Sequence, residues 1–285
     1  MKKMYSFIKG EYPYQDKILM LEKVHAEELS YPEEGYNILF PIEEQSFWFQ
    51  HRNRCIEKVI SAYPSKSLID VGGGNGCVTW HLQEQGHDVT LLEPSIKGCQ
   101  NARRRGVEKV ICGLFKEEYI KPHTVEGICL FDVLEHIEDD RRFLEFIHSR
   151  MQANARLYLT VPACKKLWSK EDEKAKHYRR YEQEELRQLL EVSGFKVEFS
   201  NYFFGFLYRP IWLMRVIKGS LKRVQEKKDK EEEVLINEHK SYYMKIKPLM
   251  DYLLGKELRN ILSQSTKRGS SLIIVATASK TVSGG

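Results

Sequence analysis

Residues 68–77 of the chain, Leu-Ile-Asp-Val-Gly-Gly-Gly-Asn-Gly-Cys, decide the fold. An aliphatic run enters a group of glycines and continues into helical spacing, so the pattern predicts a buried strand, a tight turn and a helix. Glycine accepts positive φ and has no Cβ, so a ligand can approach the backbone closely. The free N–H groups at the start of the helix attract an anionic group. This stretch therefore indicates a ligand-binding turn at the edge of a sheet.

The alternation of strands and helices continues on both sides of this turn. The pattern predicts strands at 67–71, 88–92, 109–112, 127–131, 156–161, 195–200 and 271–277, and helices at 76–85, 95–105, 139–152 and 182–193. Gly86 and Gly194 follow two of these helices, where left-handed C-caps are expected. The order predicts an α/β fold: a Rossmann-like, mostly parallel seven-stranded sheet with helices on both faces.

Four segments are expected along the chain. Residues 1–62 form an N-terminal extension that ends in a covering helix at 43–62, and residues 63–200 form the core. Residues 201–269 form a helical insert before the last strand, and residues 270–285 hold that strand and a tail. Of the 17 residues from 201 to 217, 12 are apolar or aromatic, and residues 201–230 carry eight basic and two acidic side chains. Such an element can roof an apolar substrate pocket, lie on an anionic bilayer, form a dimer interface or pack on the core.

The composition excludes several classes of protein. The 285 residues include 45 Lys and Arg and 40 Asp and Glu, a net charge of +5, so no nucleic-acid partner is expected. The six cysteines include no Cys-x-x-Cys pair, which indicates reduced thiols and no metal site. No apolar run approaches the roughly 18 residues of a membrane span. We expect a cytoplasmic protein, with peripheral membrane contact through 201–230 as an open alternative.

Two acidic residues frame the glycine turn. Asp70 ends the first strand, where a carboxylate suits a ligand whose cationic amine lies beside its anionic group. Glu93 lies 23 residues further along, at the edge where ribose hydroxyls are commonly held. Together they indicate an amino acid joined to a nucleoside. A dinucleotide turn needs Gly-x-Gly-x-x-Gly, whereas Gly76 comes one residue early, so nicotinamide binding is the weaker alternative.

Residues 70–76 resemble the Asp/Glu-x-Gly-x-Gly-x-Gly motif of class I S-adenosylmethionine-dependent methyltransferases, and Glu93 is similar to their ribose-binding acid. Residues 131–139 resemble the segment that follows the fourth strand in that family, and residues 158–163 are similar to its fifth strand. Residues 177–181, His-Tyr-Arg-Arg-Tyr, are similar to a bacterial subgroup of small-molecule methyltransferases with a His-x-Arg-Arg-Tyr signature. The resemblance covers about residues 43–200 and the final strand.

The resemblance implies S-adenosylmethionine as the cofactor. The positions it assigns to the cofactor are Asp70, Gly72, Gly74, Gly76, Glu93 and Asp132. It adds Trp48 and Arg52 from the covering helix, for which ordinary packing against the sheet stays an open alternative. The chain departs from the family after the third strand, where no acidic residue is present to meet the adenine amine. Backbone groups of Gly113 and Leu114 are expected there instead.

Methyl transfer from a sulfonium is an in-line displacement, so alignment and exclusion of water matter most. A hydroxyl or protonated amine acceptor also needs a base, and His136 and His177 are the candidates. A structural role for each histidine stays open. The expected function is methyl transfer to a small organic acceptor, a class that includes lipophilic biosynthetic intermediates. The alternatives are a nicotinamide-dependent oxidoreductase and a non-catalytic membrane-associated binding module; the oligomeric state is not predicted.

Overall fold

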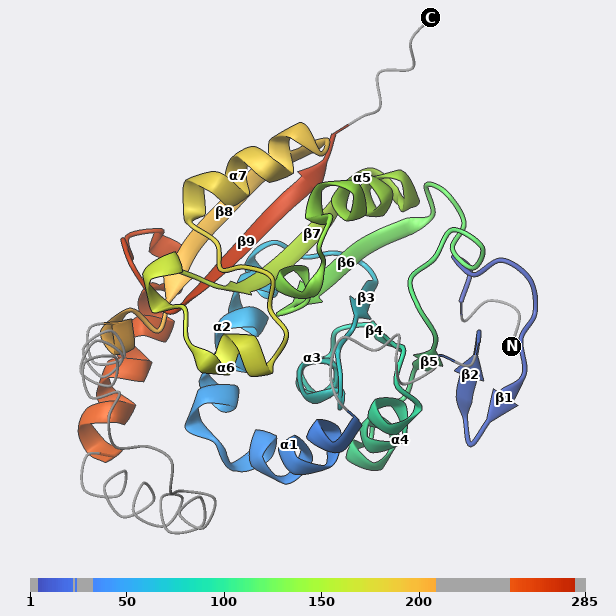
Figure 1. Ribbon diagram of the computed structural model, residues 1–285, viewed down its shortest axis with the longest axis horizontal. Coiled ribbons are helices and arrows are strands. Elements are labelled where there is room, and N and C mark those ends of the chain that lie inside the picture. The colour runs from blue at the N-terminus through green and yellow to red at the C-terminus, as the bar shows by residue number, and fades with distance from the viewer. Residues whose placement is uncertain (1–4, 23, 25–32, 209–246, 280–285) are drawn as a thin grey trace, which may run out of the picture.

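The computed structural model describes residues 5–22, 24, 33–208 and 247–279, and its centre is one mixed sheet (Figure 1). The strands are β1 (Tyr14–Gln15), β2 (Ile18–Met20), β3 (Leu68–Val71), β4 (Val89–Glu93), β5 (Val110–Cys112), β6 (Val125–Phe131), β7 (Met151–Pro162), β8 (Phe195–Phe203) and β9 (Ser271–Ala278). Their order is β1-β2-β5-β4-β3-β6-β7-β9-β8. The seven predicted strands, β3 to β9, are confirmed. The sequence did not predict β1 and β2, which extend the sheet beside β5.

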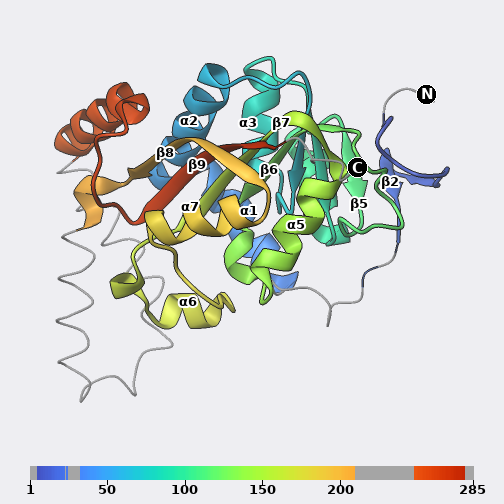
Figure 2. The same cartoon turned by 90° about the horizontal axis from the view of Figure 1, so that it is seen from above.

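Helices cover both faces of the sheet, as predicted. They are α1 (Glu33–Gln45), α2 (Phe47–Ala62), α3 (Cys77–Glu84), α4 (Ile96–Arg105), α5 (Asp140–Arg150), α6 (Lys170–Lys174) and α7 (Gln183–Val192). Figure 2 shows α2 and α3 on one face and α5 and α7 on the other. The prediction of one covering helix over 43–62 is wrong, because the chain breaks at Ser46 into α1 and α2. The Ser46 side chain accepts a hydrogen bond from the Trp48 amide and caps α2, which favours a new helix start.

The strand order places the ligand-binding edge. The strands from β2 through β5, β4, β3 and β6 to β7 are parallel, and β9 runs antiparallel to β7 and β8. The chain builds outward from β3 to β5 and then returns to β6 beside β3. Ligands of such open sheets bind at the carboxyl ends of the strands where this reversal occurs. The segments after β3 and β6 therefore meet at the candidate site.

The core follows from the alternation of side chains along the central strands. On β9, Leu272 and Ile274 pack into the cluster on one face, whereas Ile273 and Val275 pack into the cluster on the other. A strand buried on both faces is a continuous apolar run, which is how the segment at 271–277 reads. Burial of each such side chain stabilises the fold by about 2 kcal/mol, so the sheet is a rigid base for the site.

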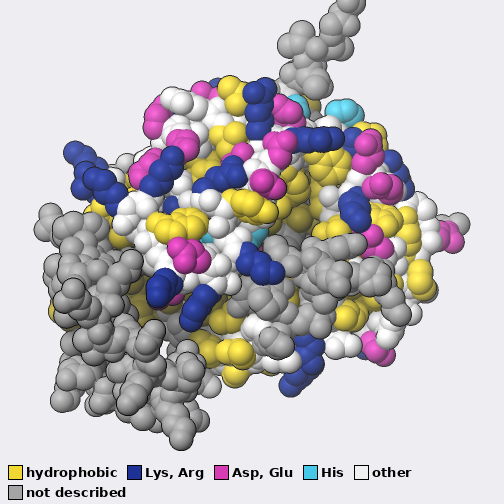
Figure 3. All heavy atoms as spheres, in the orientation of Figure 1, with side chains coloured by type: hydrophobic (Ala, Val, Ile, Leu, Met, Phe, Trp, Pro, Cys, Tyr) yellow, Lys and Arg dark blue, Asp and Glu magenta, His cyan; other side chains and the backbone are white. Residues whose placement is uncertain are grey.

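The segment before β9 is described only at its two ends, residues 201–208 and 247–269. β8 runs to Phe203, past the expected strand end at residue 200. Phe203 and Phe204 are fully buried, so the first aromatic residues of the expected insert belong to the core. The rest of the basic segment within 201–230 lies outside the described residues. Among the described residues, no helix has the length and apolarity to cross a membrane. The face drawn in Figure 3 intersperses acidic and basic side chains.

Candidate functional site

The glycines of the turn have distinct structural roles. Gly72, Gly74 and Gly76 all have positive φ, at +71°, +58° and +68°. A Cβ at Gly76 would lie 2.7 Å from the Ala102 Cβ, so this glycine lets α3 pack against α4. A Cβ at Gly74 would meet nothing within 4 Å. Gly74 is therefore the position where the backbone is open to a ligand.

Asp70 lies behind the turn and not at its open side. Its side chain is fully buried, and Thr79 Oγ1 donates a hydrogen bond of 2.6 Å to Oδ2. A Cβ at Gly73 would come within 2.5 Å of the same oxygen. Burial raises the pKa of Asp70 to about 6, because the charged form is desolvated. The structure thus gives Asp70 the position of a brace for the turn.

Glu93 lies beside the open glycine, as the spacing predicts. It is 1% exposed, and its carboxylate accepts hydrogen bonds from the Gly74 amide (2.9 Å) and the Ser95 amide (2.8 Å). The Tyr36 hydroxyl donates a third, of 3.0 Å. Desolvation raises the pKa of Glu93 to about 6, although these three hydrogen bonds oppose the rise. The acid is held rigidly next to Gly74, where a ribose hydroxyl would meet it.

Helix α1 lies across the turn through contacts that sequence reasoning missed. The Asn75 side-chain amide donates to the Tyr36 carbonyl (2.9 Å) and to Glu43 (3.3 Å). Arg105 of α4 forms an ion pair of 2.8 Å with Glu43. These partners are 32 to 62 residues apart in sequence, and no motif signals their pairing. They fix α1 over the glycine turn.

Gly113 and Leu114, expected to meet the adenine, lie against the N-terminal segment. A Cβ at Gly113 would come within 2.8 Å of the Leu21 Cβ. The Leu114 amide donates a hydrogen bond of 3.3 Å to Glu22 Oε1, and Lys116 pairs with Glu22 at 3.0 Å. A carboxylate is thus present beside β5 after all. It comes from residue 22, which the sequence analysis did not single out.

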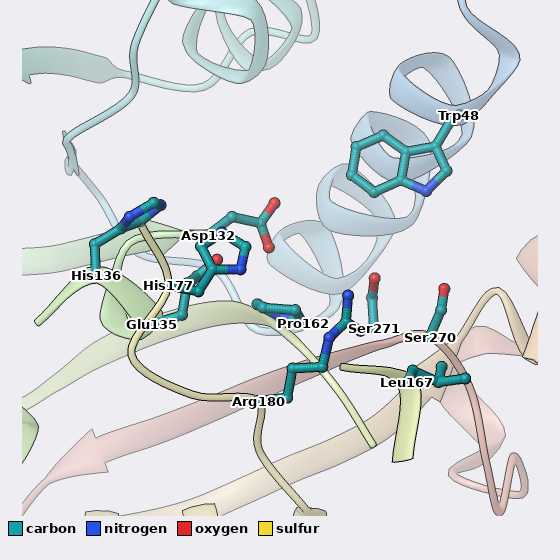
Figure 4. A pocket seen from close by; sticks show the side chains of 10 residues that line it. All are labelled: Trp48, Asp132, Glu135, His136, Pro162, Leu167, His177, Arg180, Ser270 and Ser271. Atoms are coloured by element: carbon teal, nitrogen blue, oxygen red, sulfur yellow. The ribbon is translucent and has the colours of Figure 1, made fainter. Parts of the chain in front are cut away.

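A cavity of about 310 Å³ opens at the carboxyl ends of β6 and β7 (Figure 4). Four of the predicted site residues line it: Trp48, Asp132, His136 and His177. The others that line it are Glu135, Pro162, Leu167, Arg180, Ser270 and Ser271. Figure 4 shows the two histidines, Asp132 and Glu135 gathered on one side, and the Trp48 ring on the far side. The structure thus joins segments from four distant parts of the sequence.

Helix α2 carries Trp48, which lines this cavity, and Arg52, which pairs with the cavity residue Asp132. Arg52 is buried and forms an ion pair of 2.5 Å with Asp132, whose backbone has a φ of +57°. Its guanidinium lies 5.8 Å from the centre of the Trp48 ring. Arg52 Nε is buried with no hydrogen-bond partner among the described residues. A charged donor held beside an acid suits the amino-acid end of a zwitterionic ligand.

The His-Tyr-Arg-Arg-Tyr segment is held by two carboxylates. Arg179 and Tyr181 both bind Asp140 at the start of α5, at 2.6 and 2.8 Å. His177 and Arg180 both bind Asp172 of α6. The segment therefore has a fixed path along the cavity.

His177 is oriented by Asp172, and His136 packs against it. The His177 Nδ1 lies 3.0 Å from Asp172 Oδ1, and the two imidazole rings meet edge to face with centres 4.7 Å apart. Burial opposes ionisation of Asp172, but its contacts with His177 and Arg180 outweigh that effect and lower its pKa to about 2. Burial, and then the neighbouring His177, lower the pKa of His136 to about 4. His136 is therefore neutral near pH 7.

Comparison with known proteins gives the family of the chain. A family model described as "Methyltransferase domain" matches residues 43–199. The mitochondrial ubiquinone biosynthesis O-methyltransferase of Schizosaccharomyces pombe is 27% identical over an alignment of 110 residues that covers 35% of this chain. The match spans 39% of the length of that curated relative.

Solved structures show the same fold. A methyltransferase of Thermotoga maritima, described as a possible histamine N-methyltransferase, matches with a TM-score of 0.51 and 17% identity over 85% of this chain and 99% of its own. The phosphoethanolamine N-methyltransferase 2 of Haemonchus contortus, solved with S-adenosyl-L-methionine, matches with a TM-score of 0.54 and 13% identity. The match covers 89% of this chain and 59% of that chain. The plantazolicin methyltransferase BamL matches with a TM-score of 0.54 and 17% identity, over 88% of this chain and 92% of its own.

The residues around the turn fit an S-adenosylmethionine cofactor. Gly74 offers open backbone, Glu93 offers a buried carboxylate beside it, and Arg52 offers a charged donor next to the cavity residue Asp132. The family model covers more than half of the chain, and the fold places the turn and Glu93 at the carboxyl edge of the sheet, where ligands of such folds bind. The chain therefore belongs to the methyltransferase domain family, and its core is a Rossmann-like S-adenosylmethionine-dependent methyltransferase domain.

Proposed function

We propose that the whole chain transfers a methyl group from S-adenosylmethionine to an oxygen of a small organic acceptor. The observation that carries the proposal is the cavity of about 310 Å³ at the carboxyl ends of β6 and β7, a volume that suits a small molecule. Trp48, Pro162 and Leu167 give it apolar walls, which favour an acceptor with a lipophilic part. The name of the curated relative, an O-methyltransferase of ubiquinone biosynthesis, supports oxygen as the accepting atom.

The cofactor is proposed to lie along the carboxyl edge of the sheet. Gly72, Gly74 and Gly76 shape the turn that it crosses, and Glu93 accepts hydrogen bonds from its ribose. Because Tyr36 already donates to Glu93, a ribose hydroxyl shares this carboxylate with Tyr36 or displaces it.

The two ends of the cofactor meet different groups in this proposal. The adenine lies near Gly113 and Leu114, where Glu22 supplies the carboxylate for its amine. The amino-acid end lies near Trp48, Arg52 and Asp132. Asp70 acts indirectly, through the shape of the turn.

His177 is the proposed base for the proton of the acceptor. Its Nδ1 is bound to Asp172, so its Nε2 is the nitrogen left for an acceptor hydroxyl. An ionised carboxylate at this position stabilises the imidazolium that forms. His136 is a weaker base because its pKa is lowered to about 4, and its proposed role is to set the position of the His177 ring.

The outer segments are proposed to close the site. The Trp48 ring stacks on the Phe204 ring at 5.3 Å, so the covering segment 1–62 meets the beginning of the insert 201–269 beside the cavity. Ser270 and Ser271, from the final segment 270–285, line the same cavity. Peripheral membrane contact through 201–230 rests mainly on residues outside those described, and it stays a sequence prediction.

Calorimetric titration with S-adenosylmethionine and with S-adenosylhomocysteine tests the cofactor assignment. We expect binding of both, a strong loss of affinity in Glu93→Ala and no binding of NADH. The acceptor class is tested by incubation with pairs of aromatic compounds that differ only in carrying a hydroxyl or an amino group. Mass spectrometry then shows which member of each pair is methylated. Methylation of amines alone would overturn the assignment to oxygen, and absence of cofactor binding would overturn the proposal.

Turnover of two histidine variants tests the catalytic assignment. We expect His177→Ala to lower kcat about 100-fold with little change in cofactor affinity, because it removes a positioned base. His136→Ala is expected to lower kcat less. Unchanged kcat in both variants would remove the two histidines from the reaction.

The binding-module alternative predicts sedimentation with anionic vesicles and no methyl transfer to any acceptor in a cell extract.

A further inference from the structure

One corner of the cavity holds three groups of the kinds that bind transition metals. Glu135, His136 and His177 each offer one ligand atom, and these atoms lie within 4.8 Å of one another. Glu135 and His136 are consecutive in the short 3₁₀ turn Leu134–His136 after β6, and His177 reaches them from the segment after α6. Figure 4 shows all three on the same side of the cavity.

Two of these groups lack the partners that buried polar atoms normally have. Glu135 is 1% exposed, and its Oε2 has no hydrogen-bond partner among the described residues. His136 Nδ1 is likewise buried and without a partner there. Buried polar atoms are nearly always satisfied, so two unsatisfied atoms lining one cavity indicate a missing ligand. Because one atom is a carboxylate oxygen and the other an imidazole nitrogen, a cation satisfies both.

The two arginines whose charges reach Glu135 are each paired with another acid. Arg52 is paired with Asp132, at 2.5 Å. Arg180 is paired with Asp172, at 2.8 Å. A bound cation would offset the cost of burying the Glu135 carboxylate.

The third group has the surroundings of a metal-binding histidine. His177 Nδ1 lies 3.0 Å from Asp172, which leaves Nε2 as the ring nitrogen available to a metal. A histidine that binds a metal through one nitrogen usually donates the other N–H to a carboxylate.

We propose that Glu135, His136 and His177 bind one divalent transition cation of the zinc class, with a coordination position open toward the cavity for an oxygen of the acceptor. Two imidazoles and one carboxylate are a set that zinc uses at catalytic sites. Tetrahedral ligand atoms at bonds of about 2.1 Å lie about 3.4 Å apart, so small side-chain rotations would bring these atoms into place. The cysteine spacing predicted no metal site, and the ligands of this cluster are a carboxylate and two imidazoles instead.

The inference rests on the proposed function for the identity of the fourth ligand, and it changes the role of His177. A cation lowers the pKa of a hydroxyl that it binds, so the acceptor would lose its proton to water without a protein base. The cation also fixes the acceptor oxygen relative to the cofactor. In this form His177 is a ligand rather than a base.

Metal titration of the full chain tests the site directly. Protein freed of any affinity tag and dialysed against a chelator is titrated with Zn²⁺ by calorimetry, and bound zinc is measured by elemental analysis. We expect about one equivalent of zinc and much weaker binding of Mg²⁺, which prefers oxygen ligands. Glu135→Gln, His136→Gln and His177→Gln should each weaken binding at least about tenfold. His87→Gln removes a histidine outside the cluster and should bind zinc as the parent does.

Two further measurements separate this inference from the proposed function. Thermal unfolding of each variant shows whether it is folded, and Co²⁺ added to the parent should give the visible bands of a low-coordinate site that Glu135→Gln lacks. Binding of S-adenosylhomocysteine without zinc binding would overturn the cation site and leave the proposed function standing. Zinc binding without cofactor binding would overturn the proposed function and leave the cation site standing. Full activity in chelator-treated, zinc-free protein would return His177 to the role of base.

Discussion

At the scale of single residues, two glycines of the same turn are needed for different reasons. Gly76 is confined by Ala102, 2.7 Å from the position of a Cβ, whereas the space beside Gly74 is open. A side chain at Gly76 therefore meets the protein itself, and a side chain at Gly74 meets only a ligand. The effects on stability and on affinity should separate accordingly.

The substitution Gly74→Ala should lower cofactor affinity at least about tenfold while costing about 1 kcal/mol of unfolding free energy, because only the positive φ is strained. Calorimetric titration and urea unfolding measure the two effects. Gly86→Ala is the matched control, since its φ is +85° and its Cβ also meets nothing within 4 Å. It should cost similar stability and leave affinity unchanged. Equal affinity in Gly74→Ala and the parent would contradict the open-backbone role.

Glu93 gives cofactor binding a dependence on pH. Its folded pKa is raised to about 6, so the carboxylate that accepts ribose hydrogen bonds is fully formed only above that pH. Affinity should be constant from pH 7 to 8 and about tenfold weaker near pH 5. Titration calorimetry across this range measures the profile. The change should disappear in Glu93→Gln, and its persistence there would assign it to another group.

The same burial makes stability change in the opposite direction. The folded state of Glu93 takes up a proton at higher pH than an ordinary carboxyl group at 4.5, so its contribution to stability falls as pH rises through that window. Asp70, with a folded pKa of about 6, adds a second contribution of the same sign. The cofactor therefore binds best in the pH range where these two carboxylates destabilise the empty protein.

Among the helices and strands, helix α2 connects the N-terminal covering segment, residues 1–62, to the cavity. It begins at Ser46, and its first turns carry Trp48 and Arg52. Trp48 stacks on Phe204, and Arg52 pairs with Asp132, so one helix start positions two sides of the site. The break at Ser46 matters because it sets where this helix begins and which face it presents.

Replacement of Ser46 by Ala should cost about 1 kcal/mol of stability, because the Trp48 amide loses its capping oxygen. It should also weaken cofactor binding, because Arg52 loses its fixed position. Urea unfolding and calorimetry are the measurements. Ser61→Ala, at the exposed end of the same helix, removes a hydroxyl whose two hydrogen bonds, with Glu57 and His87, lie at the surface, and it should change neither quantity. Full stability in Ser46→Ala would show that the break does not depend on this cap.

At the scale of the whole molecule, one carboxylate connects three distant segments. Glu257, in helical residues 247–260, accepts hydrogen bonds from the amides of Phe204 (2.9 Å) and Gly205 (2.7 Å). Its other contact is His51 of α2, at 2.8 Å. The end of β8, the covering helix and the second end of the insert thus meet at one buried group.

Glu257→Ala should therefore lower the unfolding free energy by about 3 kcal/mol, since it leaves two amides and an imidazole without their acceptor. The midpoint of thermal unfolding measures this loss. Asp251→Asn alters an exposed ion pair with Lys247 on the same helix and should cost less than about 0.5 kcal/mol. Equal losses in the two variants would contradict the connecting role of Glu257.

The sequence alone predicted the sheet, the turn and the cofactor class, because these depend on local patterns. The run into residues 72–76 needs only neighbouring residues to specify a strand, a turn and a helix. The spacing of Trp48 and Arg52 on one helical face is also local, so their proximity was predictable, whereas the pairing of Arg52 with the cavity residue Asp132 was not. The break at Ser46 was missed because residues 43–45 continue the helical pattern up to it.

Contacts across the fold were decided only by the tertiary structure. Tyr36 reaches Glu93 across 57 residues, and Glu22 reaches Leu114 across 92, and no periodicity encodes such pairs. The meeting of Glu135 with His177 likewise depends on how the segment after α6 returns over β6. Sequence determines which groups each element carries, because propensity and spacing act along the chain. Packing determines which of those groups meet, because burial and charge pairing act through space.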